Sequence, residues 1–176
     1  MRWRFITINT KNSWLPGDGR GFRHRAHRIH SSGDYRNPPP AEEHAGLRHV
    51  NQQRSGDKVV LPRDARPRIA KALLEALTQY RFKALSVASD HAHLLIELPD
   101  VVPQIKVIIG DAKRVASKAV GDLLPGTVWS AGCDYEPVDD ARHFDACEHY
   151  VLTKQGAGTW TWSFRDGGMW HEDRNR

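Results

Sequence analysis

The most regular alternation of hydrophobic and polar positions lies between Ser89 and Leu98, where the chain reads Ser-Asp-His-Ala-His-Leu-Leu-Ile-Glu-Leu. Successive side chains of a β-strand point to opposite faces of a sheet. One face of the strand predicted here carries only apolar residues, namely Ala92, Leu94, Ile96 and Leu98. We therefore expect helices to cover that face. The opposite face carries His91 and His93, whose Cα atoms lie about 7 Å apart by the strand rise.

Similar patterns predict the other elements of the chain. Strands are expected at residues 2–10, 81–89 and 127–137, the last with a bend at Gly132. Amphipathic helices are expected at residues 64–80, 103–124 and from Asp139 or Asp140 to Lys154 or Gln155. No periodicity is found between residues 12 and 57. The aromatic segment 157–176 is typical of a short strand or a packed arm.

The order of these elements is strand, helix, strand, strand, helix, strand and a terminal helix. This order predicts an α+β fold of the ferredoxin-like, split βαβ type, in which an antiparallel sheet carries two helices on one face. The terminal helix, which bears Tyr150, is added to this core. The second face of the sheet is expected to be open, with the histidine pair on it. We interpret the 176 residues as one domain with a basic loop insertion at about 12–57 and an aromatic tail at about 157–176.

The charge of the chain is positive and unevenly distributed. Twenty-six Lys and Arg residues against 21 Asp and Glu give a net charge of +5, and the sequence pI is about 9.4. The segment from Arg20 to Arg36 holds five arginines and three histidines against a single acid, Asp34. Such a block favours a polyanionic partner such as nucleic acid, although a basic, solvated loop would have the same composition. Trp14, just before the block, is a candidate for stacking on unpaired bases.

Other features limit the location of the protein. No run of 18 or more apolar residues is present, so no membrane span is expected. The first residues lack the apolar region and cleavage site of a signal peptide. Cys133 and Cys147 show neither metal-type spacing nor a disulfide framework. We expect two thiols in a reducing cytoplasm.

His91 and His93 are spaced so that their two imidazoles can converge on one metal ion. A His-x-His strand also occurs in zinc hydrolases and in cupin-type iron sites. An amidohydrolase barrel needs about 250 residues, and a jelly roll has many short strands without long helices. Both classes are excluded by the length and the predicted helices. A metal site and a pair of exposed histidines both remain open from this motif alone.

Tyr150 is the second candidate for chemistry. On a helical wheel Phe144, Val151 and Leu152 face the core, whereas Tyr150 lies on the flank of that stripe and is expected at an edge or cleft. A phenol with an ordinary pKa of about 10 is a weak nucleophile. Attack on phosphorus becomes feasible when a metal ion withdraws charge from the phosphate.

These motifs together resemble the HUH single-tyrosine transposases. The shared features are the His-Ala-His-Leu-Leu-Ile strand, the lysine-bearing helix after it and the tyrosine on the last helix. The chain is most similar to the branch of REP-associated tyrosine transposases, which the segments 14–21 and 150–156 also resemble. The resemblance extends from Phe5 to Gln155.

The resemblance implies a DNA transposition enzyme, a site-specific endonuclease that nicks and rejoins single-stranded DNA near hairpins. His91 and His93 would bind Mg²⁺ or Mn²⁺. Tyr150 would attack the phosphate, leaving a 5′-phosphotyrosine and a free 3′-hydroxyl. The resemblance leaves open whether the protein acts as a monomer or as a homodimer that exchanges its tyrosine helices.

One position departs from the family pattern. Relatives commonly supply a third metal ligand, Gln or Asn, one helical turn after the tyrosine, where this chain has Lys154. Gln155 follows it and lies about 140° round the helix from Tyr150. Gln155 can therefore share the side of Tyr150 only if the helix loosens before Gly156. We expect Gln155 as the third ligand and Glu148 as the alternative.

Contacts to DNA are expected from basic and aromatic side chains. The predicted set is Lys113, Lys154, Arg20, Arg23, Arg25, Arg28 and Trp14. For Lys113 a solvated helix face is the competing interpretation. Two other function classes also remain. One is a catalytically silent module of the same fold that binds single-stranded or hairpin nucleic acid, and the other is a metal-dependent RNA or cyclic-phosphate hydrolase.

Overall fold

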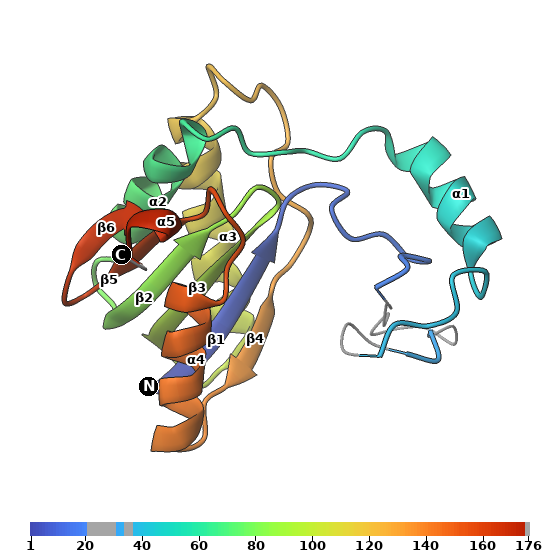
Figure 1. Ribbon diagram of the computed structural model, residues 1–176. Helices are drawn as coiled ribbons and strands as arrows, with labels where there is room; N and C mark the ends of the chain where they lie inside the picture. The colour runs from blue at the N-terminus through green and yellow to red at the C-terminus, as the bar shows by residue number, and fades with distance from the viewer. Residues whose placement is uncertain (21–30, 34–36, 175–176) are drawn as a thin grey trace. The chain divides into compact units, whose positions relative to one another are not determined.

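The computed structural model describes residues 1–20, 31–33 and 37–174. The chain divides into two compact units, which are described separately (Figure 1). The main unit comprises Met1–Thr10 and Val60–Arg176, and the insertion unit comprises Lys11–Val59. Arg23, Arg25 and Arg28, which were predicted to contact DNA, lie outside the described residues.

The main unit is built on a sheet of six described strands, all paired antiparallel. The order across the sheet is β4-β1-β3-β2-β5-β6. The strands are β1 (Arg2–Asn9), β2 (Phe82–Val87), β3 (His91–Leu98), β4 (Asp134–Pro137), β5 (Trp160–Ser163) and β6 (Gly167–Trp170). With the helices of this unit, the sheet confirms the predicted α+β class.

Helices lie on both faces of this sheet (Figure 1). They are α2 (Ala65–Ala76), α3 (Val102–Ala119), α4 (Ala141–Thr153) and the short α5 (His171–Arg174). Helices α2 and α3 pack together on one face, and α4 lies across the other. The alternation of β3 explains the first layer, because Ala92, Leu94 and Ile96 are completely buried.

The prediction that the histidine face is open was wrong. Val151 and Leu152 of α4 are buried against Ala84 and Leu95 of the sheet. Leu95 shares a face with His93, so an apolar residue stands in the middle of the face that was expected to be solvated. Trp3 and Phe5 of β1 extend this apolar surface. The apolar stripe of α4 buries it because hydrophobic area on both partners is removed from water.

The segment before β4 is mostly irregular, although a strand was predicted from residue 127. Strand pairing begins only at Asp134, and Trp129 forms an isolated bridge with Thr10. Gly132 adopts a positive φ of 71°, which agrees with the predicted bend. The aromatic tail, for which a strand or an arm was expected, forms the hairpin of β5 and β6 and extends the sheet beyond β2.

In the insertion unit, helix α1 (Ala45–Ser55) was not predicted. None of its residues is buried, so it has no apolar stripe that a periodicity argument could detect. Polar contacts tie it to the loop instead. Asn51 Nδ2 donates to the carbonyl of Pro16 at 3.0 Å, and Asn12 Nδ2 donates to carbonyls at the end of the helix.

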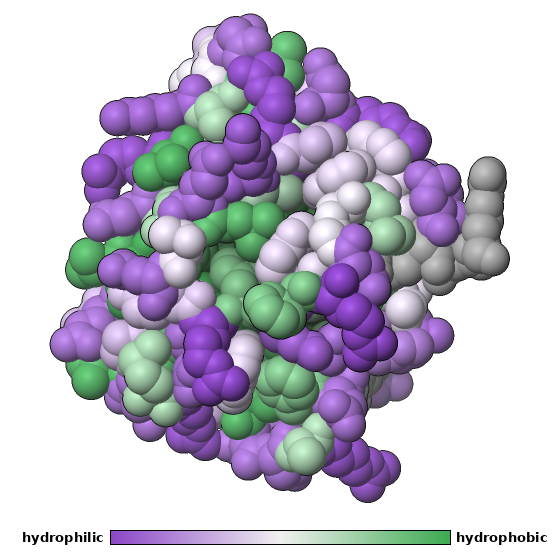
Figure 2. Space-filling view, turned by 90° about the vertical axis from the view of Figure 1, so that its left-hand side faces the viewer, coloured by the Kyte–Doolittle hydropathy of each residue, from purple (hydrophilic) through white to green (hydrophobic). Residues whose placement is uncertain are grey.

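Figure 2 shows the side of the main unit that carries the β5–β6 hairpin. Apolar side chains on this face gather in a central hollow, and hydrophilic side chains surround them. Among the described residues, no helix combines the length and the apolar composition needed to cross a membrane.

Packing of α4 should contribute measurably to stability. We expect Val151→Ala to lower the free energy of unfolding by about 2 kcal/mol, because the residue is fully buried and the substitution removes two methyl groups. Val107→Ala is the matched control, since Val107 is 63% exposed on α3 and should change stability by less than about 0.5 kcal/mol. Urea unfolding of the full chain measures both. Equal effects of the two substitutions would contradict the packing of α4 on the sheet.

Candidate active site

The candidate site lies where α4 crosses β3 and β1. His91 and His93 project from β3 on the α4 side, and their ring centroids are 4.6 Å apart. In the register of the sheet, His93 stands opposite Thr7 on β1 and Ser86 on β2. Directly opposed residues share a face, so polar side chains form a row across a sheet that is otherwise apolar here.

His91 is held by hydrogen-bonding groups at both ring nitrogens. Its Nδ1 lies 2.7 Å from the Asp90 carboxylate, and its Nε2 lies 3.4 Å from Oε1 of Gln155. A carboxylate oxygen only accepts hydrogen bonds, so Nδ1 carries the proton of this pair. In a neutral His91 the Nε2 lone pair therefore points at the Gln155 amide.

The orientation of that amide follows from its other contact. Nε2 of Gln155 donates to the Tyr150 carbonyl at 2.9 Å, which leaves Oε1 directed at His91. Two acceptors thus face each other. Two acceptors cannot form a hydrogen bond with each other, so the Gln155 Oε1 lies near His91 Nε2 without donating to it.

The end of α4 explains how Gln155 reaches His91. The helix stops at Thr153, and the backbone N–H of Lys154 caps it by donating to the Tyr150 carbonyl at 3.1 Å. Gln155 therefore lies beyond the end of the helix, so the helical rotation that would direct its side chain away from His91 does not apply to it. Glu148, the alternative ligand, forms an ion pair of 3.2 Å with Lys83 instead. The structure brings Gln155, and not Glu148, to the histidines.

His93 is buried, with 7% of its surface exposed. Its ring stacks on Phe5 with centroids 5.0 Å apart, and its Nδ1 lies 3.0 Å from Thr7 Oγ1. Burial lowers the pKa of His93 to about 3, with a further contribution from the charge of His91, whereas Asp90 acts in the opposite direction. His93 is thus a neutral imidazole, the form that can bind a metal ion.

Tyr150 lies beside His93 and remains accessible. Its ring packs edge-on against His93 and Phe5, with centroid distances of 5.4 and 5.9 Å. The residue is 42% exposed. Its position at the edge of the covered face agrees with the prediction from the helical wheel. Tyr150 is therefore accessible to solvent at a position directly beside the buried His93.

The Ser86 hydroxyl is one of the few buried polar groups in the described part of the chain without a hydrogen-bond partner. It is 1% exposed and stands opposite His93. A buried, unpaired hydroxyl costs free energy, so each such group in a folded protein requires an explanation. Its position next to the histidine pair adds to the polar character of the site.

The remaining predicted DNA contacts have different surroundings. Lys113 was expected on the surface of its helix, but it is buried. Its Nζ donates to the carbonyls of Ser130 and Gly132, both at 2.6 Å, so it fastens the segment before β4. Burial lowers the pKa of Lys113. Lys154 is exposed next to the site, whereas Arg20 and Trp14 belong to the insertion unit.

Sequence reasoning missed the groups that orient the ligands. Asp90 holds His91, and Thr7 and Phe5 hold His93. Asp90 directly precedes the His-Ala-His motif, which was a usable signal. The partner of His93 was not predictable, because Thr7 is 86 residues away and meets it only through the pairing of β1 with β3.

Comparisons with known proteins give one match. No family model matches the chain, and no curated protein matches it. Among solved structures, the chain is similar to a REP-associated tyrosine transposase bound to a REP hairpin, with 12% sequence identity and a TM-score of 0.45. The match covers 86% of this chain and 64% of the other. An identity and a TM-score of this size do not establish a family.

Burial of a neutral His93 predicts loss of stability in acid. Its pKa in the folded chain, about 3, is lower than the value of about 6.5 expected after unfolding. Between these values the unfolded chain binds the proton, so stability falls as the pH decreases. We expect His93 to contribute about 2 kcal/mol of the stability lost between pH 7 and pH 5 in metal-free protein.

Urea unfolding of the wild type and of His93→Gln at both pH values, with EDTA present, isolates this contribution. The variant should lose less stability between pH 7 and pH 5. If both proteins lose the same amount, His93 is not held neutral by burial.

Proposed function

We propose that this protein nicks and rejoins single-stranded DNA through a covalent phosphotyrosine at Tyr150, as an HUH-type transposase. The observation that supports this most is the convergence of Tyr150, His91, His93 and Gln155, with the Gln155 Oε1 directed at His91 Nε2 from 3.4 Å. We also propose that β1, α2, β2, β3, α3 and β4 form a ferredoxin-like, split βαβ core. On this core α4 places the tyrosine.

The reaction needs no external energy. The Tyr150 hydroxyl loses its proton and its oxygen forms a bond to phosphorus, while the bond from phosphorus to the 3′-oxygen breaks. The leaving 3′-oxygen takes up one proton, so no net proton is released, and the 5′-phosphate remains on the tyrosine. Attack by a 3′-hydroxyl on this phosphotyrosine reverses the steps and joins strands. Each transesterification exchanges one phosphodiester bond for another, so the bond energy is conserved.

His91, His93 and Gln155 are the residues that would hold a divalent cation, Mg²⁺ or Mn²⁺. Their fit rests on three observations: the neutral His93, the tautomer of His91 set by Asp90, and the facing acceptors of His91 and Gln155. Two imidazoles suit Mn²⁺ better than Mg²⁺, which prefers oxygen ligands. When bound, the ion supplies positive charge to a phosphate oxygen.

The chain's own residues supply the rest. Phe5 and His93, which stack on each other, both pack edge-on against the tyrosine ring, and the exposed Lys154 next to it can bind a flanking phosphate. We propose hairpin-flanked single-stranded DNA as the substrate. We propose that the site is completed either by α4 of the same chain or by α4 of a second copy, in a homodimer that exchanges these helices.

The nucleophile can be tested directly. Incubation with labelled single-stranded DNA that carries a hairpin, in the presence of Mn²⁺, should give an adduct that survives denaturing electrophoresis. Tyr150→Phe should abolish the adduct but retain DNA binding, because only the hydroxyl is lost. Tyr80→Phe is the matched control, since Tyr80 lies at the other end of the sheet and follows α2.

An adduct of undiminished yield with Tyr150→Phe would disprove the assignment. Absence of an adduct with the wild type, in Mn²⁺ and in Mg²⁺, would also disprove it.

The third ligand has its own test. Gln155→Ala should weaken Mn²⁺ binding by at least about tenfold, since even outer-shell partners of a metal site contribute that much. Glu148→Ala should leave Mn²⁺ binding nearly unchanged, because Glu148 is paired with Lys83. Calorimetric titration with Mn²⁺ measures both variants. A loss of binding in Glu148→Ala but not in Gln155→Ala would reverse the assignment.

A second function is a module that binds structured single-stranded nucleic acid without cutting it. The observation that favours it is that no three His, Cys, Asp or Glu side chains are grouped for a metal ion in the part of the chain that the structure describes. A site that depends on an amide ligand binds metal weakly. Hairpin binding that is insensitive to both EDTA and His91→Ala, without an adduct, would favour the module.

A further inference from the structure

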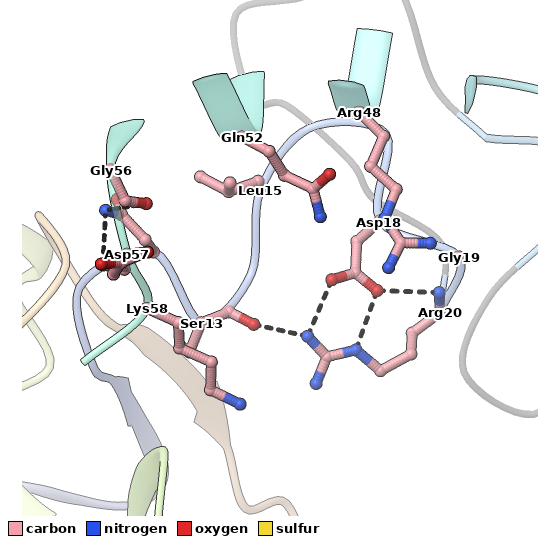
Figure 3. A pocket seen from close by; sticks show the side chains of 11 residues that line it. Ser13, Leu15, Asp18, Gly19, Arg20, Arg48, Gln52, Gly56, Asp57 and Lys58 are labelled. Atoms are coloured by element: carbon pink, nitrogen blue, oxygen red, sulfur yellow. Dashed lines mark hydrogen bonds and ion pairs between the residues drawn. The ribbon is translucent and has the colours of Figure 1, made fainter. Parts of the chain in front are cut away.

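The insertion unit contains a pocket of about 670 Å³ that the chemistry at Tyr150 does not use. It lies between the loop of residues 12–20 and helix α1 (Figure 3). Figure 3 shows the polar ends of Arg20, Arg48, Gln52 and Lys58 directed toward a common space. All of its lining residues belong to the insertion unit.

Two contacts of the loop with helix α1 and the segment after it build this pocket. Asn12, in the left-handed region with a φ of 61°, donates from Nδ2 to the carbonyls of Gly56 and Asp57 at 3.3 and 3.2 Å, which closes one end. Gly17 lets the loop approach Arg48 of helix α1. A Cβ on Gly17 would lie 2.6 Å from the backbone nitrogen of Arg48, so only glycine allows the loop to approach α1 this closely.

The charges of the lining are unequal. Asp18 is committed to Arg20, whose Nε and Nη2 each donate to the carboxylate at 2.8 Å. Burial alone would raise the pKa of Asp18, but the hydrogen bonds from Arg20 and the charges of Arg20 and Arg48 hold it below its ordinary value. The carboxylate therefore orients Arg20 and is already satisfied. Arg48 and Lys58 add two further positive charges to the same lining, and Asp57 adds one negative charge, so Arg20, Arg48 and Lys58 face two acidic residues.

The lining also limits the size and polarity of a ligand. Leu15 is the one large apolar side chain among the described residues of the pocket. Pockets for small organic ligands are mostly apolar and enclosed, and this one is neither. Two guanidinium groups and a side-chain amide that line one pocket suit a phosphodiester and the polar edge of a base. Trp14 lies next to them, with the Arg20 guanidinium 4.4 Å from its ring centroid.

We propose that this pocket binds the sugar–phosphate backbone of an unpaired DNA strand, apart from the site that cuts it. Arg20, Arg48 and Lys58 bind consecutive phosphates, and the Gln52 amide contacts a base edge. The choice of DNA as the polyanion rests on the proposed function. The insertion unit then holds a strand while the main unit performs the chemistry.

The test measures binding of a labelled oligothymidylate to the full chain by fluorescence anisotropy over a series of salt concentrations. Each phosphate contact to single-stranded nucleic acid contributes about 0.7 to the slope of log K against log salt. Arg48→Gln and Lys58→Gln should each reduce the slope by about 0.7 and weaken binding at low salt. Arg48→Lys should restore most of the slope, because it restores the charge.

Arg54→Gln is the matched control, since Arg54 is an exposed arginine of the same helix that does not line the pocket. It should leave the slope unchanged. If Arg54→Gln reduces the slope as much as Arg48→Gln does, binding is diffuse and the pocket is not a site. Unchanged slopes for Arg48→Gln and Lys58→Gln also overturn the proposal.

Localisation and adduct assays separate this proposal from the proposed function. An oligothymidylate with photoreactive iodouracil should crosslink to residues 12–20 or 45–58, and crosslinks confined to the main unit would overturn the pocket. The adduct at Tyr150 is scored in parallel. Loss of binding in the pocket variants without any wild-type adduct supports the pocket and disproves the nuclease. A wild-type adduct together with unaltered binding in the pocket variants supports the nuclease and disproves the pocket.

Discussion

The packing of helix α4 on the second face of the sheet is the interaction on which the site depends. Phe144, Val151 and Leu152 cover an apolar surface that β1, β2 and β3 provide, and His93 is buried beside it whereas His91 stays partly exposed. The same contact brings Tyr150 to within 5.4 Å of His93, measured between ring centroids. Hydrophobic burial has no chemical specificity of its own, but here it positions the reactive side chains of Tyr150 and His93.

Burial also determines the state of the polar groups. A histidine on an open sheet would exchange protons with water near pH 6.5, whereas His93 under α4 stays neutral to about pH 3. Asp90 then fixes the ring of His91 by accepting a hydrogen bond from its Nδ1, and the Gln155 Oε1 lies 3.4 Å from its Nε2. The result is a cluster of polar side chains whose rings and amide are held in fixed positions by neighbouring groups. Our proposed function depends on this preorganisation.

The two units of the chain are built on different physical principles. The main unit has apolar cores on both faces of its sheet, which hold the side chains around His91 and His93 in a fixed geometry. The insertion unit has a helix without buried residues and is held by asparagine side chains and a close glycine contact. A surface of this kind offers charged side chains to a partner and has no rigid apolar pocket. In our proposals, one unit does the chemistry and the other holds the strand.

The sequence by itself determined the features that depend on local periodicity. The alternation of β3 predicted a helix-covered face and a histidine pair, the stripe of α4 placed Tyr150 on its flank, and the α+β class followed from the order of the elements. Helix α1 escaped because its stability does not come from an apolar stripe. Only the tertiary structure decided three further points: that α4 covers the histidine face, that Gln155 turns toward His91, and that Lys113 is buried under the segment before β4. Each of these depends on contacts between residues far apart in the chain or on how a helix ends, and neither leaves a periodic signal in the sequence.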